Sequence, residues 1–445
     1  MRTNSGDTAP LPPYARSNPA FMMKSLNESL ESYGMLNAIE KPLVVAAILL
    51  RMQDKSFDIS QLEGKSSPTD GEIICSESTY PKLSFIATRA VLNTINSEIG
   101  YTPLRYFAEQ LMNEDKYDVI SRMYGGKYSY SGKDGHDLGI VLTPIHITDM
   151  CCKLLELKPG DRVLEPCCGT GRFLVNAMKY VGDNVKGLEV QEDLYTLSSI
   201  NVKVNGGVNS GIELRDFFKD DLSGRKFTAG FMNPPYSQAK TELEFTEQLL
   251  NSLEIGGRAA VLVPVSTMIG KTAKDRRLKA EILKSHTLEG VISLNKDTFY
   301  GVGTVPCIAV FTAGEPHPSE KRVKFINFEQ DGWEVKMHTG LIETESAKDR
   351  LKYLLECWNG QRRDYGTSFM VETVIASCDE WLHSFYYYND EIPAEKDFAD
   401  SLADYLTFEF NMIVHGRGYL FVSGKEGTKI EEPSKPRQCE ILFEE

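Results

Sequence analysis

The chain has 445 residues, of which 41% are hydrophobic and 25% charged, and its formal net charge is −14. This composition is ordinary for a globular protein with two or three domains. The acidic balance argues against a protein that grips nucleic acid unaided, because phosphates are neutralised by Lys and Arg. The nine cysteines include no CxxC pair, and their odd number suits free thiols in a reducing cytoplasm, where we expect the protein to reside.

The first third of the chain has a helical pattern. Residues 1–20 are rich in Pro, Ser and Asn and lack the apolar segment of a secretory signal, so we expect a mobile end. Over residues 21–135 apolar side chains recur every three or four positions, above all at 25–52 and 101–124, which predicts a helical N-terminal domain. The longest apolar runs are far shorter than the roughly 20 residues of a membrane helix, so no membrane association is expected.

Residues 136–318 have a different pattern, in which short β-branched runs alternate with helical stretches. This alternation predicts an α/β fold with a mainly parallel, seven-stranded sheet covered on both faces. The expected helices include 171–181, 194–205 and 243–254. The seven expected strands are 161–166, 184–190, 211–216, 227–233, 257–264, 288–294 and 304–312.

The pattern weakens after residue 318. Residues 319–422 are expected to form a C-terminal α/β extension, and 423–445 a polar tail. Within the extension, 322–337 could form a two-stranded hairpin. Two helices are expected at 345–359 and 398–410.

Chemistry-bearing residues begin where the first expected strand ends, at Glu165 and Pro166. A loop with Gly169 and Gly171 follows and then a helix, so the backbone can approach a ligand closely and the helix offers amide donors. A GxG turn is weak evidence by itself, since many nucleotide binders share it. The acidic residue before the loop would repel a pyrophosphate and suits a cationic ligand better.

The next three strand ends also carry polar groups. Glu189 ends the second strand and could accept the hydroxyls of a ribose. Asp216 follows the third strand and could bind an adenine amine, with Phe217 stacking on the ring. The fourth strand leads to Asn233 in the stretch "NPPY". Any one acidic residue is more often a helix cap or a surface charge, but four successive strand ends make coincidence unlikely.

In order and spacing these motifs resemble those of S-adenosylmethionine-dependent N6-adenine DNA methyltransferases; they read "LTP", "EPCCGTGRF", "GLEV", "RDFF", "NPPYS" and "DTFYGVGTVPCIAVF". Within this group the chain is similar to modification subunits of type I restriction–modification systems and to the methylase part of type IIB catalytic subunits. The resemblance covers about Met22–His317. It implies a Rossmann-like methyltransferase core in residues 136–318, and methyl transfer to N6 of adenine in duplex DNA.

The resemblance also implies site residues. The cofactor S-adenosylmethionine would be bound by Thr143, Pro144, Glu165, Pro166, Gly169, Gly171, Phe173, Glu189, Asp216 and Phe217. The catalytic pocket would consist of Asn233, Pro234, Pro235 and Tyr236. Tyr236 and Phe299 would lie beside the target base, although an ordinary core position for Phe299 and Tyr300 is an open alternative.

The catalytic residues suit the chemistry that the resemblance implies. The exocyclic amine of adenine is a poor nucleophile, because its lone pair is delocalised into the ring. The side-chain carbonyl of Asn233 and the main-chain carbonyl of Pro234 can accept its hydrogens and stabilise the developing charge. The base must leave the duplex to reach such a pocket. No metal is needed, and the seven histidines form no HxxxH or HxH pair.

Two positions depart from the family pattern. Glu165 stands where the family usually has Asp, and Arg172 stands where a small residue is common. Arg172 could pair with a nearby carboxylate or crowd the cofactor.

Other functions and partners stay open. The alternatives are a methyltransferase acting on RNA or on a protein glutamine side chain, and a catalytically inactive DNA-binding subunit on the same scaffold. The expected partners are double-stranded DNA and a separate specificity subunit, with a restriction subunit as a further candidate, in a hetero-oligomer. The run Gly270–Lys279 has five basic residues in ten, which we interpret as a solvated helix surface.

Overall fold

The computed structural model describes residues 142–207, 211–219, 222, 227–236, 240–299, 303–336, 340–389 and 394–417, together with Leu43 and Ala46. The predictions for residues 1–20, for the helical domain at 21–135 and for the tail at 423–445 therefore concern residues outside the described part, apart from those two positions. The chain divides into two compact units, Met1–Tyr388 and Asn389–Glu445. Among the described helices, none combines the length and the apolar character needed to cross a membrane.

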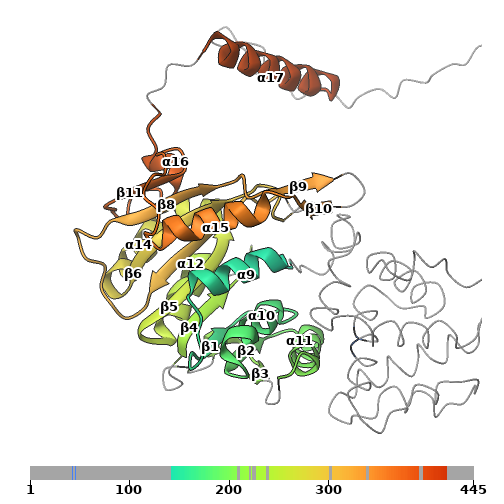
Figure 1. Cartoon of the computed structure of the whole chain (residues 1–445), viewed down its shortest axis with the longest axis vertical. Coiled ribbons are helices and arrows are strands. Elements are labelled where there is room, and N and C mark those ends of the chain that lie inside the picture. Colours follow the sequence, from blue (N-terminus) through green and yellow to red (C-terminus); the bar gives the residue numbers. More distant parts are fainter. Residues whose placement is uncertain are drawn as a thin grey trace, which may run out of the picture. The chain divides into compact units, whose positions relative to one another are not determined.

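A nine-stranded sheet forms the centre of the first unit (Figure 1). Its strand order is β11-β8-β6-β7-β5-β4-β1-β2-β3, and a separate two-stranded sheet pairs β9 with β10. The strands are β1 (Val163–Glu165), β2 (Val185–Glu189), β3 (Gly211–Leu214), β4 (Phe227–Met232), β5 (Leu253–Pro264), β6 (Thr287–Leu294), β7 (Pro306–Thr312), β8 (Val323–Phe328), β9 (Trp333–Lys336), β10 (Gly340–Glu343) and β11 (Met370–Thr373).

All seven strands predicted for residues 136–318 are present. The strands β1 to β5 pair in parallel, whereas β7 runs antiparallel between β5 and β6. The expectation of a mainly parallel sheet is thus confirmed in this part. The segment assigned to the C-terminal extension continues the same sheet, because β8 pairs in parallel with β6 and β11 pairs antiparallel with β8.

The prediction of a hairpin at 322–337 is wrong. Its two strands do not pair with each other, since β8 lies in the large sheet and β9 pairs with β10. The burial of the two strands reflects this difference in pairing. Four of the six residues of β8 are buried, as a strand inside a covered sheet requires, whereas β9 is mostly exposed.

Helices cover both faces of the sheet, over two separate hydrophobic clusters. Side chains of α9, α10 and α15 contribute to one cluster, and side chains of α12 and α14 to the other. Within the described residues, the helices of the first unit are α9 (Ile145–Leu154), α10 (Arg172–Val181), α11 (Glu192–Val204), α12 (Glu242–Asn251), α13 (Val265–Ile269), α14 (Ala273–Ser285), α15 (Ala347–Trp358) and α16 (His383–Tyr386), with a 3-10 turn η2 (Phe217–Lys219).

The predicted helices are present with small differences at their ends. The helix predicted at 243–254 ends at Asn251, because Leu253 already begins β5. The prediction at 345–359 corresponds to α15. The prediction at 398–410 corresponds to α17 (Glu395–Val414), the described helix of the second unit, in which no residue is buried.

The topology places the candidate site residues at one edge. Because β1, β2, β3 and β4 are parallel, their carboxyl ends meet at the same side of the sheet. In the register Glu165 lies beside Gly187, two residues before Glu189. Asn233 follows directly after β4.

Candidate active site

Glu165, the last residue of β1, is a buried carboxyl group with an unused acceptor. Its side chain is 4% exposed, and it accepts a hydrogen bond from the main-chain N–H of Leu174. Its Oε2 atom has no hydrogen-bond partner among the described residues. Burial raises the pKa of Glu165 well above its ordinary value. A buried carboxylate oxygen without a donor is costly, so the site favours a ligand that brings a positive charge or an N–H group.

The glycine loop after β1 is held by its own backbone. Cys168 N–H donates to the carbonyl of Leu188 at 3.0 Å, and Gly171 N–H donates to the carbonyl of Cys168 at 2.7 Å. Gly171 has φ of 75°, and a Cβ atom there would lie 3.2 Å from Cβ of Ser198. Both the backbone conformation and the close approach of α11 therefore require glycine.

The side chain of Glu189, at the end of β2, binds main-chain N–H groups of two segments, the glycine loop and the residues that follow β2. One carboxylate oxygen accepts from Val190 N–H and Gln191 N–H at 2.8 Å each, and the other accepts from Gly169 N–H at 3.0 Å. Burial nevertheless raises the pKa of Glu189. The side chain thus ties the glycine loop to the second strand. The oxygen that binds Val190 and Gln191 has used both of its lone pairs, whereas the oxygen that binds Gly169 keeps one for a further donor.

Asn233 is fixed by two side chains that lie on either side of its amide. Its Nδ2 group donates to Oγ1 of Thr143 at 3.0 Å, and its Oδ1 atom accepts from the hydroxyl of Tyr236 at 2.9 Å. Burial, aided by the nearby Cys307 and Glu242, raises the pKa of Tyr236, so its hydroxyl stays protonated and donates. These two bonds determine which way the amide points, and Oδ1 retains one lone pair.

Arg172, which departs from the family pattern at the start of α10, contacts the main chain of Thr143. Its Nη1 atom donates to the main-chain carbonyl of Thr143 at 2.8 Å. Pro144 follows and precedes the first turn of α9, where its carbonyl accepts from the N–H groups of Ile147 and Thr148 at 3.1 Å. Arg172 thereby links α10 to the residue that holds Asn233.

Other predicted cofactor residues lie at the same edge with their side chains engaged in the protein. Asp216 accepts from Phe218 N–H at 3.0 Å and pairs with Lys219 at 3.1 Å, and these contacts lower its pKa. Phe217 is 4% exposed and belongs to the hydrophobic cluster under α12. Pro166 and Pro234 are buried and Pro235 is half-buried. Their contacts with a cofactor or a base stay predictions.

Two predicted aromatic residues lie in the core. Phe173 is 1% exposed, and its ring stacks on Phe231 with centroids 4.2 Å apart. Phe299 is also 1% exposed, as expected if it is an ordinary core residue. Tyr300 lies outside the described residues. A role for Phe173 beside the cofactor and for Phe299 beside the base therefore stays a prediction.

The sequence did not reveal that Thr143 and Asn233 are hydrogen-bonded. They are 90 positions apart, and Thr143 was predicted to line the cofactor instead. No local pattern signals such a contact. The topology produces it, because α9 precedes β1 and its first turn faces the end of β4.

Comparisons with known proteins place the chain in a family. The family model described as N-6 DNA Methylase matches residues 115–391. The type II restriction enzyme and methyltransferase RM.BcgI of Heyndrickxia coagulans is 42% identical over 90% of this chain and 71% of its own length. The type I restriction enzyme MjaVII methylase subunit of Methanocaldococcus jannaschii is 23% identical over 53% of this chain, which spans only 47% of that relative.

Solved structures agree with this fold. A chain from a type I R-M system, solved in work on its complex assembly and conformational transition, has a TM-score of 0.59 at 14% identity, covering 91% of this chain and 98% of its own. A protein from Vibrio vulnificus YJ016, described as a modification subunit of a type I restriction enzyme, has a TM-score of 0.53 at 17% identity, covering 79% and 91%. The expected Rossmann-like methyltransferase core is thus confirmed. With its strand order, its "NPPY" turn and these matches, the chain belongs to the N-6 DNA methylase family.

Proposed function

We propose that this chain transfers a methyl group from S-adenosylmethionine to N6 of adenine in duplex DNA, as the modification component of a restriction–modification system. The observation that carries the proposal is the amide of Asn233, held between Thr143 and Tyr236 at the end of β4. An enzyme that methylates an amine needs such an oriented acceptor, because the amine becomes positively charged during attack.

The proposed cofactor fits the residues present. The unpartnered Oε2 atom of Glu165 would accept a hydrogen bond from the amino group of the methionine part, and this cation would stabilise the buried charge. The lone pair left on the Glu189 oxygen that binds Gly169 would accept a ribose hydroxyl. When bound, S-adenosylmethionine supplies an activated methyl group, so that the protein contributes mainly position and electrostatics.

The residues of the "NPPY" turn would act on the base. Oδ1 of Asn233 and the main-chain carbonyl of Pro234 would accept the two hydrogens of the adenine amine, which draws its lone pair out of the ring. The amine nitrogen would then bond to the methyl carbon that S-adenosylmethionine supplies, with the sulfur as leaving group, and would lose a proton to water. Tyr236 would offer its ring to the base while its hydroxyl orients Asn233. The two prolines keep the turn rigid, so little reorganisation is needed.

A separate specificity subunit is the proposed partner, and α17 is its proposed docking element. Five apolar side chains recur along this helix at spacings of three or four residues, and each is more than half exposed: Phe398, Leu402, Leu406, Phe410 and Ile413. Such a stripe is typical of a helix that packs against partner helices. We expect Phe410→Asp to abolish co-purification with the product of a neighbouring gene, whereas Asp404→Lys, on the opposite face of the same helix, leaves it intact. Unchanged co-purification of the Phe410 variant would contradict this docking role.

The test of the activity is a labelled transfer assay on three substrates. The purified chain, with its partner subunit if one co-purifies, is incubated with labelled S-adenosylmethionine and duplex DNA, RNA or total protein. We expect label in DNA alone, and mass spectrometry of the nucleosides should identify N6-methyl-2′-deoxyadenosine. Label in RNA or protein would support the other methyltransferase classes. Cofactor binding without any transfer would support an inactive scaffold.

A further inference from the structure

The basic run Gly270–Lys279 contains side chains with two different roles in the structure. Lys279 is fully buried, and its Nζ atom donates to the main-chain carbonyls of Met268, Ile269 (3.2 Å) and Asp379 (3.0 Å). The same ammonium group lies 4.6 Å from the ring centroid of Trp381. Lys279 is therefore a structural residue that fixes α14 against α13 and the loop before α16.

The other four basic residues of the run are exposed. Together with Lys240 they form what we name the basic surface; its members are Lys240, Lys271, Lys274, Arg276 and Arg277. Thr272 begins α14 with a capping box, in which its hydroxyl accepts from Asp275 N–H and the Asp275 carboxylate accepts from Thr272 N–H. The backbone that carries these cations is thus anchored by the cap at one point and by Lys279 at another.

Ion pairs join two members of the basic surface to α12, which begins six residues after Tyr236 of the "NPPY" turn. Glu244, in the first turn of α12, pairs with Lys274 at 2.8 Å and with Lys240 at 3.7 Å. The bond with Lys274 lowers the pKa of Glu244 to about 2. Lys240 follows Tyr236 by four positions. Glu242, which lies with Glu244 in the first turn of α12, is close enough to raise the pKa of Tyr236. The basic surface therefore adjoins the place where the target base is proposed to bind.

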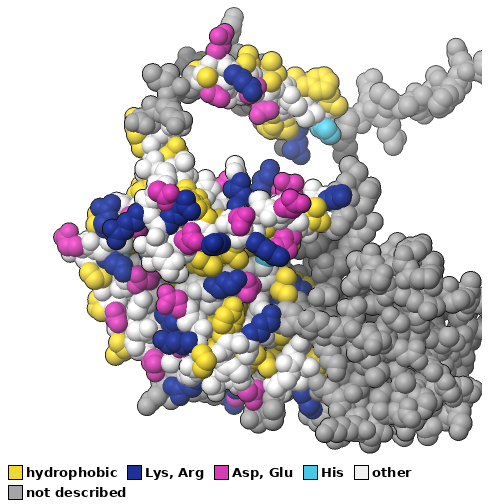
Figure 2. Space-filling model, viewed as in Figure 1, with side chains coloured by type: hydrophobic (Ala, Val, Ile, Leu, Met, Phe, Trp, Pro, Cys, Tyr) yellow, Lys and Arg dark blue, Asp and Glu magenta, His cyan; other side chains and the backbone are white. Residues whose placement is uncertain are grey.

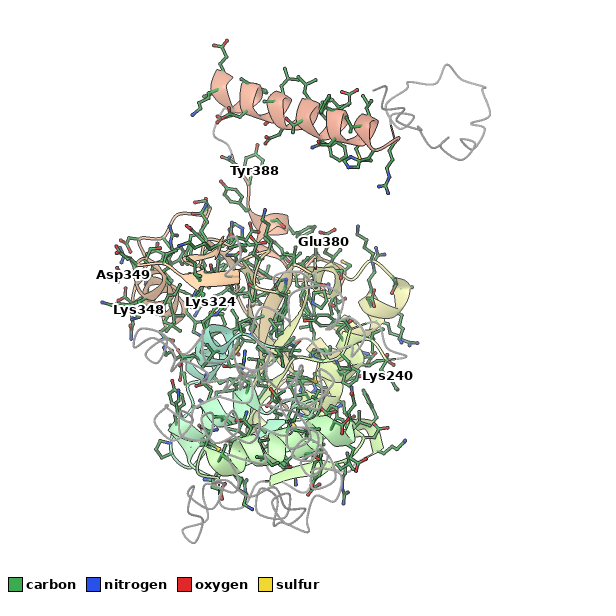
Figure 3. The ribbon with its side chains drawn as sticks, turned by 90° about the vertical axis from the view of Figure 1, so that its right-hand side faces the viewer. Lys240, Lys324, Lys348, Asp349, Glu380 and Tyr388 are labelled. Carbon is green, nitrogen blue, oxygen red and sulfur yellow. The ribbon has the colours of Figure 1, made fainter. Side chains whose placement is uncertain are left out.

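The charge of this surface contrasts with the chain as a whole. Five cations gather in a chain of net charge −14, next to Asp275 and to Glu244, whose charge together with that of Glu281 acts on Glu247. Figure 2 shows the face that carries α9 and α15, where Lys and Arg side chains are interspersed with Asp and Glu. Figure 3 places Lys240 and Lys348 of α15 on opposite sides of the domain. Among the described residues no carboxylate forms an ion pair with Lys271, Arg276 or Arg277, so these three cations can attract a polyanion to one side of the site.

We propose that the basic surface binds the phosphate backbone of duplex DNA beside the extruded adenine. The inference rests on the proposed function and names the part of the chain that contacts the substrate outside the pocket. Phosphate contacts position a protein on the duplex without reading sequence, which is the contribution that an acidic chain with a separate specificity subunit would still have to make. Arg276 and Arg277 can bind phosphate oxygens with two N–H groups each.

The test measures how salt affects DNA binding. The full chain, with its partner subunit if one co-purifies, is titrated with a fluorescent 30-base-pair duplex between 50 and 200 mM salt. Removing two cations with Arg276→Gln/Arg277→Gln should lower the slope of log affinity against log salt by about 2. The KM for DNA should rise while kcat at saturating DNA stays unchanged. The matched control Lys348→Gln/Arg350→Gln removes the same charge from α15 and should leave slope and KM as in the wild type.

Two outcomes would overturn the inference. An unchanged slope and KM in the Arg276/Arg277 variant, with normal methylation, would show that DNA phosphates bind elsewhere, and the proposed function would stand. Equal losses in the variant and in the α15 control would show a general charge effect rather than a defined surface. Absence of methyl transfer to DNA by the wild type would instead contradict the proposed function itself. Binding of S-adenosylmethionine, measured by calorimetry, confirms that each variant is folded.

Discussion

The two halves of the proposed site bind their ligands by different means. At the ends of β1 and β2 the groups are carboxylates, and Glu165 keeps one oxygen buried without a partner. At the end of β4 the groups are neutral, and Asn233 has its amide satisfied on both sides by Thr143 and Tyr236. The first half is thus built to attract a cation, whereas the second is built to hold one orientation. Changes in the first half should affect cofactor affinity, and changes in the second should affect turnover.

The largest expected effect is that of Asn233→Ala. This variant removes the oriented acceptor, so turnover should fall by about 100- to 1,000-fold or more. Cofactor affinity should remain nearly unchanged, because the carboxylate half is intact. Single-turnover methyl transfer and calorimetric titration with S-adenosylmethionine measure the two quantities separately. A similar loss in both would contradict the division of the site.

Glu165→Gln should have the opposite effect, in that it weakens cofactor binding and leaves turnover nearly unchanged. The neutral side chain can accept a hydrogen bond but cannot pair with an ammonium group, so the Kd for S-adenosylmethionine should rise by about ten- to a hundred-fold. At saturating cofactor the turnover should stay within a few-fold of the wild type. Tighter or unchanged cofactor binding would show that the unpartnered oxygen does not face the cofactor.

Thr143→Val should have a smaller effect on turnover. Valine has nearly the same shape but cannot accept the hydrogen bond from Nδ2 of Asn233, so the amide loses one of its two fixed contacts. Loss of one neutral hydrogen bond predicts a fall in kcat of up to about tenfold. Thr143→Ser keeps the hydroxyl and should restore most of the activity. Equal activity of the Val and Ser variants would show that this contact does not orient Asn233.

The smallest expected effect is on stability as a function of pH. The pKa of Glu165 is raised in the folded protein, so its contribution to stability is fully present below its ordinary value of 4.5 and is lost as pH rises through the raised value. Glu165→Gln removes this loss. The Tm of the variant without cofactor should therefore match the wild type near pH 4.5 and exceed it increasingly towards pH 8. A constant difference over this range would contradict the raised pKa.

The strands of the core were predictable because each is a short β-branched run with turn residues at its end. The run at 257–264 and its neighbours needed no knowledge of distant contacts. The pairing of strands was harder to infer. Nothing in 322–337 indicates that β8 joins a large sheet while β9 pairs with β10, because pairing depends on which surfaces remain uncovered after folding.

The side-chain partners within the site were not predictable from the sequence. The position of Asn233 after a strand was visible, but its hydrogen bond with Thr143 depends on the folded topology. Lys279 shows the same limit. It belongs to a run that reads as a solvated surface, yet it is fully buried because three main-chain carbonyls and Trp381 surround its ammonium group. Charge patterning alone does not distinguish such a residue from its exposed neighbours.

The most direct test of the central claim is a map of N6-methyladenine in a genome. The chain, expressed with its neighbouring genes in a host that lacks adenine methylation, is compared with the Asn233→Ala variant. The proposed function predicts methylated adenines at a defined sequence motif in cells with the wild-type chain and none with the variant. Unmodified DNA in both strains, from folded protein that still binds S-adenosylmethionine, would contradict the claim that Asn233 serves methyl transfer to DNA adenine.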